Sequence, residues 1–298
     1  MKKPLLKLKK NCWADSFHAY TEVRRGSSPR TFPETFKQKA GKMVEVKWYG
    51  INSLEFKYSG GSFMIDPYVS RDREKLIAPE EQEKYLADCK PDFVLMTHSH
   101  WDHLPDMLYL FEKTDTVLYA SKTACNIMRA LGVREKNLHE LVYGEKLTFP
   151  GLTVTALESR HMGIMPEDNF YEEIPFDKDF TKRESWKCGE VFAFKLEMDD
   201  LVILNGGSAN LHIPSMKGIS CDYLIYGISR WKEGFPQLLT ENLSFKRLIG
   251  VHHDEFTRPL SEFSLRDDMI RLKEAIPGLP ATELSPLQWT LLPKIQGE

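Results

Sequence analysis

The sequence predicts an α/β protein made of two β-rich halves flanked by helices. Its 298 residues show, from Val44 onward, short runs in which apolar and polar residues alternate, the pattern of half-buried strands. Strands and helices then alternate in the middle of the chain, and further apolar strands follow near its end. This order is the one expected when two β-rich layers pack together beneath outer helices.

The first half contains a β meander followed by alternating elements. Residues 44–48 and 53–58 alternate in polarity, and Gly60-Gly61 turns the chain into a third strand. A helix is predicted over residues 79–89, because Pro79 suits a first turn and acidic residues follow it. After it we expect a strand at 93–96, a helix at 104–113, a strand at 116–120, a helix at 122–131, and strands at 139–142, 147–149 and 152–157.

The second half opens with a long polar segment and continues in strands. Residues 163–187 have mixed charge and no clear period, and a loop of that length in a compact domain is usually functional or mobile. Residues 190–196 and 201–204 predict a hairpin around the turn Asp199-Asp200. We expect two more strands, at 223–226 and 248–251, and an amphipathic helix at 261–275.

Residues 1–42 differ from the rest of the chain. They hold the stretch Gly-Ser-Ser-Pro at 26–29, scattered Lys and Arg, and little sustained periodicity. We interpret them as an N-terminal extension that packs on the main domain, with a short helix near 33–39. The main domain is then predicted to cover residues 43–298.

Charge and composition exclude several classes of protein. Forty Lys and Arg stand against 43 Asp and Glu, a formal net charge of −3, so no cationic excess is present to meet nucleic-acid phosphates or a membrane surface. No run of about 18 apolar residues predicts a membrane span, and no secretory signal is recognisable. Five cysteines without paired spacing fit free thiols in a reducing compartment. We therefore expect a cytoplasmic protein that binds no nucleic acid. The oligomeric state, a homo-oligomer included, stays open.

Four potential metal ligands stand within six residues, directly after the apolar strand at 93–96. They are His98, His100, Asp102 and His103. Neutral imidazoles and a carboxylate suit zinc, and iron or manganese with less preference. Residues two apart in an extended segment point the same way, so His98 and His100 can share one ion. Asp102 and His103 follow where the chain turns into a helix, and they can face a neighbouring ion.

This run resembles the His-x-His-x-Asp-His signature of the metallo-β-lactamase superfamily. The meander from Trp48-Tyr49-Gly50 to Asp66-Pro67 is similar to the start of the superfamily's lactonase and phospholipase D-like branch, and the similarity covers roughly residues 44 to 260. The resemblance implies the fold of that superfamily: a four-layer αββα sandwich of two mixed sheets with outer helices, an α/β fold that some schemes class as α+β.

The resemblance also implies the rest of a metal site. His161, after the strand at 152–157, matches the next metal-binding histidine, and His252 matches the last one. Asp66 matches a structural aspartate near the site, which would orient the ligands. One ion would be held by His98, His100 and His161, and a second by Asp102, His103 and His252.

Two side chains beside these ligands have open roles. His253, next to the last ligand, either contacts the substrate or is packed in the fold. Trp101, inside the metal-binding run, either lines the mouth of the pocket or packs in the core. Both are candidates for residues that contact the substrate or support the ligands.

One position departs from the family pattern. The family usually has a Gly-Asp-Thr-like turn after the strand at 201–204, and its Asp bridges both metals. Here Gly207 stands where that carboxylate would be. A second ion would then lose one ligand and one negative charge. The second site would then be weaker, or a different ion, water or a side chain such as Asn205 or Ser208 would fill the gap. A mononuclear or asymmetric site is an alternative to a full pair.

The resemblance implies a hydrolase that uses one or two divalent ions, with zinc expected and manganese or iron as alternatives. A metal-activated water oriented by Asp102, the expected catalytic residue, would attack an ester, lactone or phosphodiester bond. Because Gly207 replaces the usual bridging Asp, the alternative is a non-catalytic or weakly active relative that binds a metal or another ligand.

Overall fold

The computed structural model describes residues 43–72, 74–161, 169–207, 210–228, 235–254, 274, 278 and 280–295. All of them belong to one compact unit, Gly41–Glu298. The N-terminal extension expected at 1–42 and its helix near 33–39 lie outside the described residues. So does the helix expected at 261–275, apart from Glu274.

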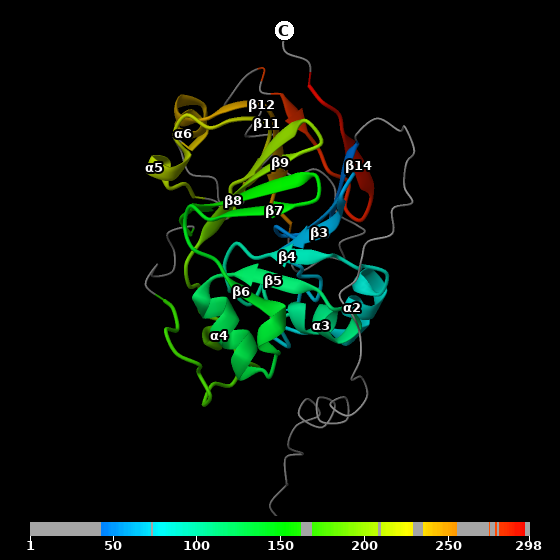
Figure 1. Cartoon of the computed structure of the whole chain (residues 1–298), viewed down its shortest axis with the longest axis vertical. Helices are drawn as coiled ribbons and strands as arrows, with labels where there is room; N and C mark the ends of the chain where they lie inside the picture. Colours follow the sequence, from blue (N-terminus) through cyan, green and yellow to red (C-terminus); the bar gives the residue numbers. More distant parts are fainter. Residues whose placement is uncertain are drawn as a thin grey trace, which may run out of the picture. The chain divides into compact units, whose positions relative to one another are not determined.

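Two mixed sheets of seven strands each form the fold (Figure 1). Along the first sheet the strand order is β14-β1-β2-β3-β4-β5-β6, with antiparallel pairing as far as β3 and parallel pairing from β3 to β6. Its strands are β1 (Val44–Trp48), β2 (Leu54–Tyr58), β3 (Gly61–Ile65), β4 (Phe93–Leu95), β5 (Val117–Ala120), β6 (Leu138–Glu140) and β14 (Trp289–Leu292).

The second sheet has the same mixed character. Its order is β13-β12-β11-β10-β9-β8-β7, with antiparallel pairing from β7 to β10 and parallel pairing from β10 to β13. Its strands are β7 (Lys146–Phe149), β8 (Leu152–Glu158), β9 (Phe192–Met198), β10 (Leu201–Asn205), β11 (Ser220–Gly227), β12 (Ser244–Val251) and β13 (Ala281–Thr282).

Helices cover the outer faces of both sheets (Figure 1). Helices α2 (Pro79–Leu86), α3 (Met107–Lys113) and α4 (Lys122–Ala130) pack on the outside of the first sheet, and α5 (Ile213–Met216) and α6 (Phe235–Asn242) on the outside of the second. The Ser121 hydroxyl caps α4 by accepting a hydrogen bond from the Ala124 amide at 3.0 Å. The αββα sandwich expected from the sequence is confirmed.

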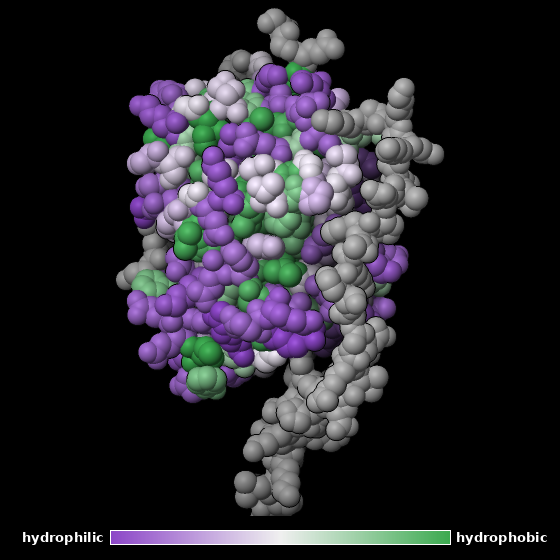
Figure 2. Space-filling model, in the orientation of Figure 1, coloured by the Kyte–Doolittle hydropathy of each residue, from purple (hydrophilic) through white to green (hydrophobic). Residues whose placement is uncertain are grey.

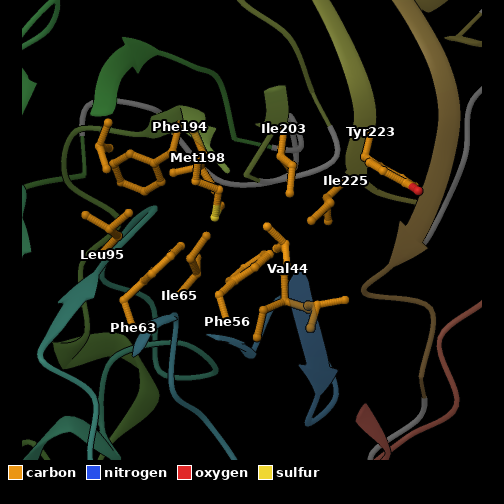
Figure 3. Close-up of a cluster of buried hydrophobic side chains, with 14 of the residues drawn as sticks. Val44, Phe56, Phe63, Ile65, Leu95, Phe194, Met198, Ile203, Tyr223 and Ile225 are labelled. Atoms are coloured by element: carbon orange, nitrogen blue, oxygen red, sulfur yellow. The ribbon is translucent and has the colours of Figure 1, made fainter. Parts of the chain in front are cut away.

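The main core lies between the two sheets. In β1 the side chains of Val44, Val46 and Trp48 are buried while the residues between them are partly exposed, because successive side chains of a strand point to opposite faces. Figure 3 shows inward side chains of the first sheet, such as Phe63, facing those of the second, such as Phe194. Burial of this apolar surface contributes a favourable free energy of about 25 cal/mol per Å², which holds the sheets together.

The predicted elements agree with the observed ones except in a few details. Helix α3 begins at Met107 instead of near residue 104, because residues 101–104 form turns that carry the second half of the metal-binding run. Pro105, which has no amide hydrogen, follows those turns. The sequence patterns also missed α5, α6, β13 and β14. Of these, β14 matters most for the sheet, because it pairs with β1 although the two strands are separated by most of the sequence.

The visible face of the domain is mostly hydrophilic, and its described cysteines are buried. Hydrophilic residues cover most of the face in Figure 2, and hydrophobic ones lie among them in smaller groups. Cys89, Cys125, Cys188 and Cys221 are buried free thiols. Within the described ranges, no helix combines the length and the apolar character needed to cross a membrane.

Candidate metal centre

Three histidines from two sheets form the first ligand group. His98 and His100 follow β4, and His161 follows β8. One ring nitrogen from each lies within 4.8 Å of the others. The Nε2 atoms of His98 and His100 and the Nδ1 atom of His161 are buried and have no hydrogen-bond partner among the described residues. Buried polar atoms normally have partners, so this convergence of unpaired nitrogens fits a divalent cation.

Asp102, His103 and His252 form the second group. Asp102 and His103 lie in the turns before α3, and His252 follows β12. Their ligand atoms also lie within 4.8 Å of one another. The Asp102 carboxylate is 4.0 Å from His103 Nε2 and 3.8 Å from His252 Nε2. The two groups adjoin, since the rings of His98 and His103 have centroids only 4.0 Å apart.

Backbone hydrogen bonds between the sheets hold the strand ends that carry these ligands. The Phe192 amide at the start of β9 donates to the Thr97 carbonyl at 2.8 Å, directly before His98. The His252 amide donates to the Ile51 carbonyl at the same distance. His252 has φ 56°, a left-handed conformation that is uncommon for a residue with a side chain. The ligands of β4 and β12 are therefore positioned by contacts made across the sandwich.

Asp66 supports the second group from behind. Its buried carboxylate accepts hydrogen bonds from His103 Nδ1 at 2.9 Å, the Thr97 amide at 2.7 Å, the Thr97 hydroxyl at 2.5 Å and Asn52 Nδ2 at 2.8 Å. Asp66 itself has φ 44°. A carboxylate on one imidazole nitrogen directs the other nitrogen toward a metal. This contact places Asp66 where the resemblance implied a supporting aspartate.

The same hydrogen bonds determine which nitrogen of His98 is free. The Thr97 hydroxyl has one hydrogen, which it donates to Asp66. Thr97 Oγ1 is also 3.0 Å from His98 Nδ1, so it accepts the hydrogen of that nitrogen. His98 Nε2 is then left as a lone pair that faces the first group. Thr97 and Asn52 were not singled out from the sequence, although Thr97 directly precedes the motif.

Burial and neighbouring charges set different protonation states in the two groups. Burial lowers the pKa of His98 well below its usual value, with the neighbouring imidazoles acting in the same direction. Burial also lowers the pKa of His100 to about 4 and that of His161 to about 3. All three are therefore neutral at pH 7, the state in which imidazole binds a metal.

Asp102 and His103 attract each other electrostatically within the second group. Burial opposes charge on both, but their mutual attraction outweighs it. The pKa of Asp102 is lowered by His103, His252 and His100, and the pKa of His103 is raised by Asp102 and Asp66. Asp102 is therefore an anion at neutral pH, ready to bind a cation or to accept a hydrogen bond.

The residues after His252 are packed into the fold. His253 stacks on Trp48, with ring centroids 4.9 Å apart and planes 24° from parallel. The Asp254 carboxylate accepts a hydrogen bond from the Ile51 amide at 2.8 Å and is ion-paired with Arg71. This stacking is the kind of packing that the second interpretation of His253 expected.

Trp101 lies within the metal-binding run and is partly buried. Its ring meets that of Tyr68 edge-on, with centroids 6.1 Å apart at 88°. The guanidinium carbon of Arg183 lies 5.5 Å from the centre of the Trp101 ring. Ser99 connects the run to the same segment, because its amide donates to the Cys188 carbonyl at 3.0 Å. The segment around 183–188 therefore packs beside the ligands.

The turn after β10 carries no carboxylate in its described residues, Asn205, Gly206 and Gly207. Gly207 has φ +72°, and a Cβ built there would lie 2.6 Å from the Phe192 carbonyl oxygen. Asn205 is buried, and its side-chain oxygen accepts a hydrogen bond from the Gly207 amide at 2.9 Å while its nitrogen donates to Asn52. Both polar atoms of the Asn205 side chain thus make hydrogen bonds within the protein. Ser208, the other side chain considered for the gap, lies outside the described residues.

Comparisons with known proteins agree with this fold. The model of the beta-lactamase superfamily domain matches residues 62–174. A UPF0173 metal-dependent hydrolase of Methanopyrus kandleri is 27% identical over 125 residues, which are 42% of this chain and 50% of that protein. The chain thus aligns with about half the length of such curated relatives.

Solved structures show the same fold at low sequence identity. Igni18, described as a metallo hydrolase from Ignicoccus hospitalis, superposes with a TM-score of 0.59 and 14% identity, covering 85% of this chain and all of that one. The metallo-beta-lactamase fold protein YhfI of Bacillus subtilis gives 0.54 and 11%, covering 84% and 99%.

Fold, motif and family model define the class of this protein as a metal-binding αββα sandwich. The family model, the curated relatives and the shared fold together support the metallo-β-lactamase superfamily as the family of this chain.

Proposed function

We propose that the chain is a metal-dependent hydrolase whose ions are bound by the two ligand groups. His98, His100 and His161 would hold one ion, and Asp102, His103 and His252 would hold the other. The observation that carries this proposal is the convergence of buried imidazole nitrogens without hydrogen-bond partners among the described residues. Three neutral imidazoles favour zinc, with manganese or iron as alternatives.

The reaction proposed is hydrolysis of an ester, lactone or phosphodiester bond in a small molecule. A divalent ion bound here supplies a water of lowered pKa and polarises a substrate oxygen. Asp102, an anion beside both groups, accepts a hydrogen bond from the attacking water and orients it. Asp66 holds His103 through its Nδ1 atom, which fixes the orientation of that imidazole. The buried free thiols support a reducing, cytoplasmic location as part of the proposal.

The test combines metal analysis with turnover. We expect the purified protein to hold at least one zinc ion per chain, and to hydrolyse bis(p-nitrophenyl) phosphate, p-nitrophenyl acetate or a simple lactone. His98→Ala should lose metal and activity together. His139→Ala is the matched control. His139 lies on β6, away from the ligands, and its Nε2 atom is hydrogen-bonded to the Glu145 carboxylate. Full activity in metal-free protein, or in His98→Ala, would contradict the proposal.

A second candidate is a binding protein without catalysis. Its support is the turn after β10, where Gly207 leaves no side chain to bridge two ions. One ion held by the three-histidine group alone would then account for the ligands. Stoichiometric metal in the wild-type protein with no turnover of any of the three substrates would favour this candidate over the hydrolase.

A further inference from the structure

The hydroxyl of Tyr68 is a buried donor that nothing in the described structure uses. Tyr68 is fully buried, and its hydroxyl oxygen has no hydrogen-bond partner among the residues that the structure describes. A buried hydroxyl without a partner is unfavourable by about 1–3 kcal/mol, and such groups in native proteins usually indicate a site for a ligand or an ordered water.

The loop that carries Tyr68 runs along the second ligand group. At one end Asp66 bonds to His103, and at the other end Arg71 pairs with Asp254, two residues after His252. Tyr68 lies between these two anchors. Its own amide donates to the Asp66 carbonyl at 2.8 Å. Tyr68 therefore belongs to a loop that passes along the side of the site formed by Asp102, His103 and His252.

The backbone directly after Tyr68 is held by several hydrogen bonds to Asp106. The amides of Val69 and Ser70 donate to one oxygen of the buried Asp106 carboxylate, at 2.7 and 2.8 Å. The Ser70 hydroxyl and Gln82 Nε2 donate to its other oxygen, at 2.6 and 2.7 Å. A side chain on a backbone fixed by this many hydrogen bonds is preorganised, which is what a group that contacts a reacting atom requires.

The surroundings of the Tyr68 hydroxyl keep it protonated. Burial raises its pKa, the Asp106 and Asp102 carboxylates raise it further, and Arg71 partly offsets them. The Tyr68 ring also meets Trp101, the residue before Asp102, edge-on. Tyr68 is therefore a hydrogen-bond donor at neutral pH.

We propose that the Tyr68 hydroxyl donates a hydrogen bond to an anionic oxygen of the substrate bound beside Asp102, which makes it a further catalytic residue. The proposal rests on the hydrolase function above and deepens it. Substrate oxygen would reach the hydroxyl from the side of Asp102 and His252, whose side chains keep about one-sixth of their surface exposed. An acyl or phosphoryl oxygen that gains negative charge is thus the chemistry that this donor fits.

Binding of inorganic phosphate to the zinc-loaded protein tests the proposal without turnover. By calorimetry, Tyr68→Phe should raise the dissociation constant of phosphate about 10- to 100-fold, the usual effect of a lost hydrogen bond to a charged group. Tyr223→Phe is the control. Its hydroxyl donates to the Pro293 carbonyl at 2.8 Å, so this variant loses a structural hydrogen bond and should bind phosphate as the wild type does.

Thermal unfolding separates a catalytic role from a structural one. Tyr68→Phe removes a hydroxyl without a described partner, so its melting temperature and zinc content should equal or exceed those of the wild type. Tyr223→Phe should melt lower. An unchanged phosphate affinity in Tyr68→Phe, or a wild-type protein that holds zinc and binds no phosphate, overturns the assignment of Tyr68.

Turnover then completes the test. With any substrate that the wild type hydrolyses, Tyr68→Phe should lower kcat about 10²- to 10³-fold, as for other lost oxyanion donors, with a smaller change in KM. If zinc and phosphate bind and no substrate is hydrolysed, the hydrolase function fails while the phosphate comparison still decides the role of Tyr68.

Discussion

The carboxylate of Asp66 accepts a hydrogen bond of 2.9 Å from Nδ1 of His103, and both side chains are almost completely buried. The contact leaves His103 Nε2 on the opposite side of the ring, toward Asp102. Asp66 also accepts from Thr97, which in turn contacts His98. One carboxylate therefore orients a histidine in each ligand group.

Replacing this carboxylate should weaken metal binding without unfolding the protein. In Asp66→Asn one oxygen becomes an NH₂ donor, so the contacts with His103 and Thr97 cannot all be kept. We expect zinc affinity to fall about 10- to 100-fold, the usual effect of losing such a support. Competition with a chelating dye measures it. Asp92→Asn is the control, since that carboxylate accepts from the Ser62 amide at the edge of the domain. Equal affinity in both variants would contradict the role of Asp66.

Restoring a carboxylate at position 207 should destabilise the protein instead of completing the site. Gly207 has φ +72°, and a Cβ there would lie 2.6 Å from the Phe192 carbonyl oxygen, far inside normal contact. We expect Gly207→Asp to lower the free energy of unfolding by at least about 2 kcal/mol. Urea unfolding measures the loss.

A second glycine separates backbone strain from collision. Gly132 has φ +87° with no heavy atom within 4 Å of a built Cβ, so Gly132→Ala should show the conformational effect alone, about 1 kcal/mol. The collision explanation would be wrong if Gly207→Asp were as stable as Gly132→Ala. A gain of bound metal in Gly207→Asp would show that the turn can move to admit the carboxylate.

The ion pair between Arg71 and Asp254 should contribute more to stability than an exposed pair. Arg71 is 8% exposed and Asp254 is completely buried, so removing one partner leaves a charge without compensation. We expect Arg71→Met to lower the free energy of unfolding by about 3 kcal/mol. For the more exposed pair Lys195–Glu197, Lys195→Met should cost less than about 1 kcal/mol. Similar losses of unfolding free energy in the two variants would show that the Arg71 pair does not stabilise the His252 segment more than an exposed pair would.

Local sequence patterns predicted much of the fold and the centre of the site. Strand and helix periods are properties of a few neighbouring residues, and they predicted β1 to β12 in order. His98, His100, Asp102 and His103 are close in the chain, so their spacing alone indicated a shared metal. The alternatives for His253 could not be separated in this way, because stacking on Trp48 joins residues 205 positions apart.

What the sequence by itself determined is therefore the α/β class, the order of most elements and a metal-binding run after a buried strand. Tertiary structure decided the rest: β14 beside β1, Asn52 and Thr97 on Asp66, and the buried Tyr68 hydroxyl, which has no hydrogen-bond partner among the described residues. It also decided that Gly207 faces a backbone oxygen. Each of these depends on which distant segments pack together, and a pattern of local periods carries no information about that.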